Sequence, residues 1–180
     1  MTFSLPFTVL AFLMALATAA YSQDIRRYGC LPPAEVTADI TARELASATR
    51  ACMDQGDPRR AVQLYLTYSS FVLFDQQRVK DESAHAIVGE LNSWIFTGYD
   101  FDQMNALKLW VEQLRDPQGK FLHETCVEIK AIGHPIYRPA YMIKRGMLPR
   151  KSDEDWMTPD FDTPTAWDKA LHEINHCPRP

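Results

Sequence analysis

The sequence has 180 residues, 19 Lys and Arg against 23 Asp and Glu, a formal net charge of −4, and 46% hydrophobic residues. A mildly acidic balance argues against nucleic-acid binding, which depends on basic surfaces. The seven glycines and the lack of alternating Val, Thr and Ile runs give strands little support. The composition therefore predicts a helical protein.

Residues 1–22 are predicted to form a cleavable secretory signal peptide. Residues 5–17 are apolar apart from Pro6 and Thr8, and small residues follow them. The small-x-small pattern allows cleavage after Ala19 or after Ser22. The apolar run is shorter than the roughly 20 residues of a membrane-spanning helix. We therefore expect a periplasmic or secreted protein that is not inserted in the membrane after cleavage.

The remaining residues, 23–180, are expected to form one domain with two disulfides. The four cysteines are Cys30, Cys52, Cys126 and Cys177, an even and widely spaced set. In an exported protein such a set is typical of disulfides rather than of free thiols. Three connectivities are possible, and the shorter loops favour Cys30 with Cys52 and Cys126 with Cys177.

Three helices are predicted in the first half of this domain. Thr41 and Glu44 form a capping-box pattern in the first helix, which ends at Gly56. Asp57 and Pro58 open the second helix, and the third runs over residues 81–96. The apolar positions are Val36, Ile40, Leu45, Ala48 and Cys52 in the first helix, Ala61, Leu64, Tyr65, Tyr68 and Val72 in the second, and Ala84, Ile87, Val88, Leu91 and Ile95 in the third.

Three further helices are predicted after Gly98. Asp100 with Gln103 caps the fourth, the fifth covers residues 118–132, and Thr163 with Pro164 opens the last. The apolar positions are Met104, Leu107, Leu109, Trp110 and Leu114 in the fourth, Phe121, Leu122, Cys126 and Ile129 in the fifth, and Trp167, Leu171, Ile174 and Cys177 in the last. The fold class is thus expected to be all-α, a single disulfide-linked domain of about six helices.

Residues 51–74 resemble one tetratricopeptide helix-turn-helix unit, with a Gly-Asp turn before Ala61, Leu64 and Tyr65. Such repeats bury their faces on neighbouring copies, and the sequence has no second copy in register. The resemblance therefore implies a packing style, although it keeps open a role as a cell-envelope adaptor.

His172 to His176 read HEINH, which matches the HExxH motif of zinc peptidases. In those enzymes the two histidines bind the metal from one helix face, and the glutamate activates a bound water. Only four residues follow His176, so the usual downstream third ligand has no segment to come from. The alternative function, a zinc-dependent hydrolase, would use His172 and His176, whereas we expect no metal and no cofactor.

Other catalytic sets are not assigned by the sequence. Ser69 and Ser70 stand on an apolar helix without a GxSxG turn, and disulfides would remove cysteine chemistry. Catalytic residues are therefore predicted to be absent, and the protein is not expected to be an enzyme.

Charge is segregated between Arg138 and Asp162. The first part of this stretch, up to Lys151, has five basic residues and no acid, and the second has five acids, two aromatic residues and no base. Three prolines indicate a loop, with its acidic-aromatic part at 151–164, and a long loop is often functional. The predicted partner-binding residues are Asp153, Glu154, Asp155, Trp156, Asp160, Phe161 and Asp162. Alternatively, the acidic half folds onto the basic half and the aromatic side chains cover the core.

An exported, disulfide-linked, helical and acidic protein of this kind resembles the periplasmic immunity proteins that bacteria pair with type VI secretion effectors. The resemblance covers the architecture and the acidic-aromatic character of residues 153–162. It implies a binding or inhibitory protein that neutralises a periplasm-acting toxin by occluding its active site. The implied partner is a secreted toxic hydrolase, held in a one-to-one complex.

Overall fold

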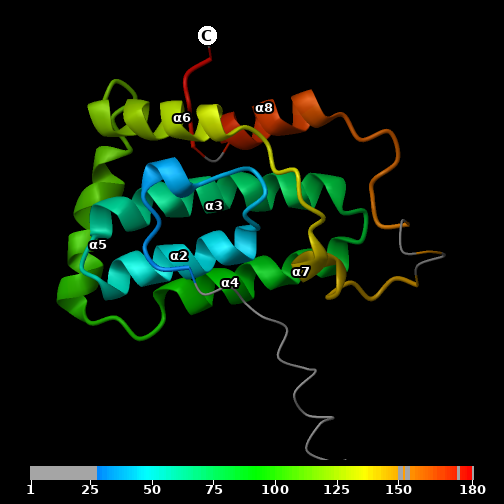
Figure 1. Ribbon diagram of the computed structural model, residues 1–180, viewed down its shortest axis with the longest axis horizontal. Coiled ribbons are helices and arrows are strands. Elements are labelled where there is room, and N and C mark those ends of the chain that lie inside the picture. The colour runs from blue at the N-terminus through cyan, green and yellow to red at the C-terminus, as the bar shows by residue number, and fades with distance from the viewer. Residues whose placement is uncertain (1–27, 150–151, 153–154, 174, 180) are drawn as a thin grey trace, which may run out of the picture.

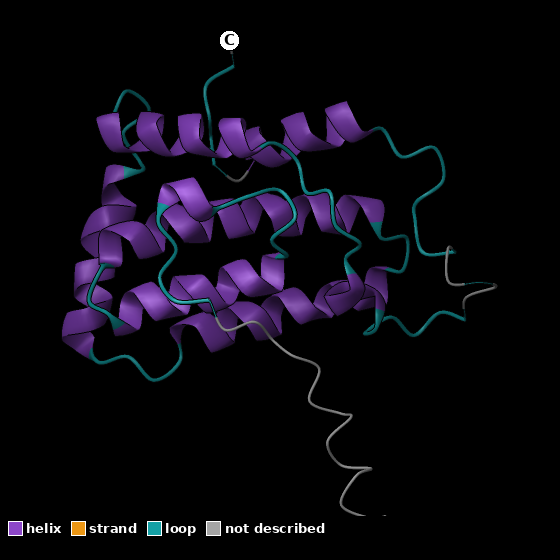
Figure 2. Ribbon diagram, in the orientation of Figure 1, coloured by secondary structure: helices purple, strands orange, loops and turns teal. Residues whose placement is uncertain are grey.

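The computed structural model describes residues 28–149, 152, 155–173 and 175–179, so the predicted signal peptide lies outside it. Helices are the regular elements of the described chain, which contains no strand, and the all-α prediction is confirmed (Figure 2). The elements, with η marking 3-10 helices, are η2 (Pro33–Glu35), α2 (Ala42–Asp54), α3 (Pro58–Arg78), η3 (Glu82–Ala86), α4 (Ile87–Phe96), α5 (Phe101–Gln113), α6 (Lys120–Ile132), α7 (Ala140–Ile143) and α8 (Thr163–Glu173).

The helix starts follow the capping signals of the sequence. At α2, the Glu44 backbone N–H donates to the Thr41 hydroxyl and the Thr41 N–H donates to the Glu44 carboxylate, at 3.3 and 2.8 Å. Asp57 caps α3 before Pro58, and Asp100 caps α5 in a second capping box. These reciprocal bonds satisfy N–H groups that have no partner within the helix, which fixes where each helix begins.

Helix α3 is the axis of the fold. In Figure 1 it lies in the middle, with α6 and α8 on one side, α2 and α4 on the other, and α5 crossing one end. A helix that is apolar on all sides is expected to be buried. The sequence predicted a single apolar face, yet the buried apolar side chains of α3 are Ala61, Val62, Leu64, Leu66, Tyr68, Phe71, Val72 and Phe74. Although α3 has 21 residues, no helix of the described ranges is long and apolar enough to cross a membrane.

Three details in the first half and middle of the chain differ from the sequence prediction. Val36 and Ile40 are buried, but they precede α2 in non-helical backbone. The third predicted helix is divided into η3 and α4. Leu109, expected on the inward stripe of α5, is 58% exposed, because Leu107 takes the buried position and residues two apart lie on nearly opposite sides of a helix.

The stretch predicted as a loop contains a short helix, α7, and the cap of the helix that follows the loop is one residue earlier than predicted. Asp162, not Thr163, caps α8, since the Thr165 N–H and hydroxyl donate to the Asp162 carboxylate at 3.4 and 2.6 Å. An aspartate satisfies the first free N–H groups of a helix as well as a threonine does. The predicted loop at 151–164 therefore ends at Asp162.

Both disulfides join the cysteines that the shorter loops favoured. Cys30 is bonded to Cys52, which ties the segment before α2 to that helix. Cys126 is bonded to Cys177, which ties the tail after α8 to α6. The two bonds hold segments that have few helical contacts of their own.

We expect the disulfide between Cys126 and Cys177 to stabilise the protein more than the other one. Replacing both by Ser should lower the free energy of unfolding by about 4 kcal/mol, because the crosslink spans 51 residues and restricts the unfolded chain. The same change at Cys30 and Cys52, which span 22 residues, should cost about 3 kcal/mol. Urea unfolding of the two variants measures the difference, and the reverse order would contradict it.

Candidate functional site

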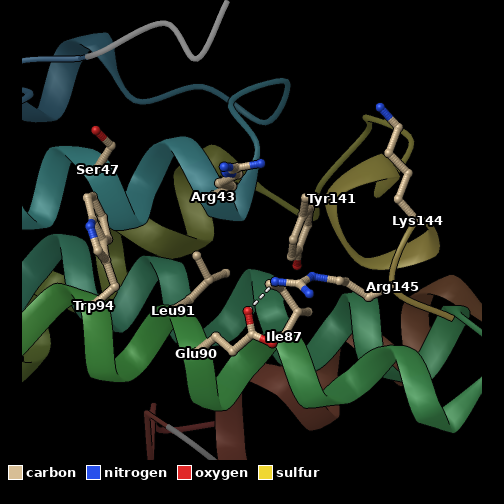
Figure 3. A pocket seen from close by; sticks show the side chains of 9 residues that line it. All are labelled: Arg43, Ser47, Ile87, Glu90, Leu91, Trp94, Tyr141, Lys144 and Arg145. Carbon is tan, nitrogen blue, oxygen red and sulfur yellow. Dashed lines mark hydrogen bonds and ion pairs between the residues drawn. The ribbon is translucent and has the colours of Figure 1, made fainter. Parts of the chain in front are cut away.

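A groove opens between α2, α4 and α7 (Figure 3). Its volume is about 500 Å³, inside the range of roughly 300–1,000 Å³ typical of small-molecule sites. Three separate parts of the chain line it: Arg43 and Ser47 from α2, Ile87, Glu90, Leu91 and Trp94 from α4, and Tyr141, Lys144 and Arg145 from α7 and the turn after it.

The two ends of the groove differ in chemistry. Figure 3 shows Trp94 and Leu91 toward one end, and Tyr141, Lys144 and Arg145 at the other. Arg145 forms an ion pair with Glu90, and both side chains are 53% exposed. Ion pairs as exposed as this one contribute little to stability. The groove therefore has an apolar end and a cationic end, on a protein whose net charge is −4.

The walls of the groove are held by contacts behind them. The Arg50 guanidinium lies 5.3 Å from the Trp94 ring centre and donates to the Trp94 carbonyl, so it joins α2 to the end of α4 beside this exposed ring. The Tyr141 hydroxyl donates to the buried Asp75 carboxylate at 2.8 Å. After Arg145, Gly146 lies so close to the Asp81 carboxylate that a side chain would clash. These contacts make the groove preformed.

The sequence did not predict this groove. Residues 43–47, 87–94 and 141–145 are far apart in the chain, and no spacing rule brings them together. Trp94 is the one residue of the groove that the sequence marked locally, because it lies outside the apolar positions of the helix predicted at 81–96. In the structure Trp94 is 44% exposed. Lys144 and Arg145, which follow α7, were singled out by the sequence only as part of a charged stretch.

The acidic-aromatic segment lies against the end of α3. The Lys80 N–H donates to the Trp156 carbonyl at 3.0 Å, the Thr158 N–H donates to the Arg78 carbonyl at 2.8 Å, and Asp155 forms an ion pair with Lys80. An isolated β-bridge between Val79 and Met157 accompanies these bonds.

Its two aromatic side chains are half-buried and pack on the body of the protein. Trp156 covers the small cluster that includes Val79 and Ile143, and Phe161 meets Phe74 edge to face at 5.3 Å. Asp160 and Asp162 are exposed, and Asp160 has a left-handed backbone with φ of 53°. Asp153 and Glu154 lie outside the described residues. Partner binding by this segment stays a prediction.

The histidines of the HEINH motif do not share a helix face. Helix α8 ends at Glu173, and His176 lies beyond it, exposed, with φ of 50°. His172 has acceptors at both ring nitrogens: the Cys177 carbonyl at Nδ1 and the Asp168 carboxylate, 3.0 Å from Nε2. Within the described residues no group of three or more His, Cys, Asp or Glu is placed to hold a metal.

A buried polar network surrounds Asp75 at the end of α3. Arg78 Nε donates to its carboxylate at 2.8 Å, and the hydroxyls of Tyr137 and Tyr141 donate to the other oxygen, each at 2.8 Å. The Ala42 N–H donates to the Tyr137 oxygen at 2.9 Å, which links the network to the start of α2. Burial raises the pKa of Asp75 above its usual range, and Arg78 and the two hydroxyls oppose the rise. The network supports the groove wall at Tyr141.

Comparison with known proteins identified no relative: no family model matches the chain, and neither does any curated protein or solved structure. The geometry of the chain therefore carries the argument on function.

We expect Asp75→Asn to destabilise the protein by about 3–5 kcal/mol, because it leaves the Arg78 guanidinium, 7% exposed, buried without its countercharge. Asp75→Leu combined with Arg78→Met should cost less than Asp75→Asn alone, since it removes both charges. Urea unfolding measures each variant. Glu112→Gln, at an exposed ion pair with Lys108, is the control and should change stability little.

Tyr137 and Tyr141 are expected to stay protonated until the protein unfolds in alkali. Burial first, and then the Asp75 carboxylate, raises the pKa of both phenols well above the usual value of 10.0. An acid with a higher pKa in the folded chain stabilises the fold below the unfolded pKa, and this contribution is lost as the pH rises further.

A titration that follows phenolate absorbance and circular dichroism together checks this expectation. The two tyrosines should ionise in the same step as the helices unfold, and replacing both by Phe should reduce the amplitude of that step. If both phenols ionise while the circular dichroism stays that of the folded protein, the two tyrosines are not held in a buried network with Asp75.

Proposed function

We propose that this protein is an exported binding protein that neutralises a toxin acting in the periplasm, by occluding the active site of that toxin. The two disulfides support export, because such bonds persist in oxidising compartments. The helical, disulfide-linked body is also the architecture of the immunity proteins that the sequence resembles. The partner we propose is a secreted toxic hydrolase.

The observation that carries this proposal is the way in which the acidic segment is presented. The backbone of residues 156–158 is bonded to residues 78–80, so the conformation of this part of the segment is set before any partner arrives. Met157 is 45% exposed, and Asp160 and Asp162 are exposed beside it. A segment that is already ordered loses less conformational entropy on binding than a free loop.

The exposed side chains supply the two kinds of contact that a docking surface needs. The acids would attract a basic rim around the active site of the toxin and accelerate association. Met157 is the exposed apolar side chain, and methionine adapts to irregular pockets. Trp156 and Phe161 support the segment from below, because their rings pack on the body of this protein.

The test uses the product of the adjacent gene, which the proposal requires to be a toxin. Its periplasmic expression should arrest growth, and co-expression of this protein should restore growth. The purified proteins should form a one-to-one complex in calorimetry. If deleting the gene for this protein leaves cells insensitive to the toxin, the proposed function is wrong.

Asp160→Asn with Asp162→Ser tests the surface without disturbing the fold. Asn tolerates the left-handed backbone at residue 160, and Ser retains a cap for α8. We expect affinity for the toxin to fall roughly tenfold, mainly through slower association at low salt. Asp102→Asn with Glu112→Gln on α5 changes the net charge equally and should have no effect. If the two variants bind the toxin with equal affinity, the acidic segment is not the docking surface, although the proposed function is not contradicted.

A further inference from the structure

We propose that the groove between α2, α4 and α7 binds small amphipathic anions, molecules with an apolar body and one carboxylate head group. This inference does not depend on the proposed toxin, because the groove and the acidic segment use different residues. It assigns a ligand class to a site that the sequence did not reveal.

The floor of the groove fits an apolar body. Leu91 is buried beneath it, and Trp94, whose ring centre lies 5.3 Å from the Arg50 guanidinium, is 44% exposed. Covering an exposed indole with an apolar body removes apolar surface from water and is favourable. Tyr141 adds a second aromatic wall, held from behind by its hydroxyl bond to Asp75.

The opposite end fits a single negative charge. Arg43 comes from α2 and Arg145 from the turn after α7, whereas the ammonium of Lys144, a third basic residue of the lining, points away from Arg145 (Figure 3). Guanidinium groups bind carboxylates through paired, charge-assisted hydrogen bonds. The guanidinium groups of Arg43 and Arg145 outnumber the one acidic side chain of the lining, Glu90, on a protein that is negative overall. Charge complementarity therefore selects an anion.

Glu90 sets a limit on the charge of the ligand. Its carboxylate pairs with Arg145 in an exposed contact that costs little to exchange, so Arg145 is able to turn to a ligand carboxylate. The carboxylate of Glu90 stays nearby and would repel a head group with two or more charges. The groove is consequently suited to a monoanion.

The separation of the two ends fixes the orientation of the ligand. The carboxylate would lie between Arg43 and Arg145, and the apolar body would extend along Leu91 to Trp94. The volume of the groove, about 500 Å³, accommodates a medium-length acyl chain. A neutral molecule with the same body would lose the cationic contacts, and a cation would meet repulsion.

Titration with decanoate tests the proposal on the protein without its signal peptide. We expect saturable one-to-one binding by calorimetry, quenching or enhancement of tryptophan fluorescence, and a higher melting temperature. Decyltrimethylammonium, which has the same chain and the opposite charge, should bind at least tenfold more weakly. Equal binding of the two compounds would overturn the proposal, and so would binding to phosphatidylglycerol vesicles without binding of decanoate.

Variants distinguish the groove from adventitious apolar sites. Arg145→Gln and Trp94→Ala should each weaken decanoate binding roughly tenfold, and Arg43→Gln should weaken it in the same direction. Lys108→Gln and Leu109→Ala are matched controls on the exposed face of α5, and should bind decanoate like the original protein. Unfolding curves confirm that each variant is folded. Unchanged affinity in Arg145→Gln and Trp94→Ala would overturn the proposal.

Discussion

The buried carboxylate of Asp75 is the interaction on which the rest of the structure depends. It sits fully buried in the last turn of the central helix α3, where an unpaired charge would be costly. Arg78 neutralises it from the next turn, and the hydroxyls of Tyr137 and Tyr141 complete its hydrogen bonds. One side chain thus requires a distant part of the chain to come to α3, and it fixes the position of α7.

Both candidate surfaces follow from that arrangement. The groove exists because the segment bearing Tyr141 is held beside α2 and α4, so its cationic end faces an apolar floor. On the other side of the network, the Arg78 guanidinium lies 5.8 Å from the Trp156 ring centre, and residues 78–80 bond to the backbone of 156–158. Residues 156–158 of the acidic segment are therefore held by the same end of α3 that positions the groove wall.

The backbone after α8, rather than the match to the HExxH pattern, determines where the two histidines of the HEINH motif lie. A metal site of this type needs both histidines on consecutive turns of one helix. The chain instead ends α8 at Glu173 and turns so that Cys177 reaches Cys126. The Cys177 carbonyl and the Asp168 carboxylate lie at the two ring nitrogens of His172, and His176 projects from a non-helical backbone.

By itself the sequence determined the helical class, the starts of α2, α3 and α5, and the preferred cysteine pairing. These are local properties, set by capping residues such as Thr41 and Asp57, by apolar periodicity and by loop length. Only the tertiary structure decided that α3 is buried on all sides, that Trp156 and Phe161 cover the core, and that Arg43, Trp94 and Arg145 share a groove. Such relations depend on packing between residues far apart in the chain, and no local spacing encodes them.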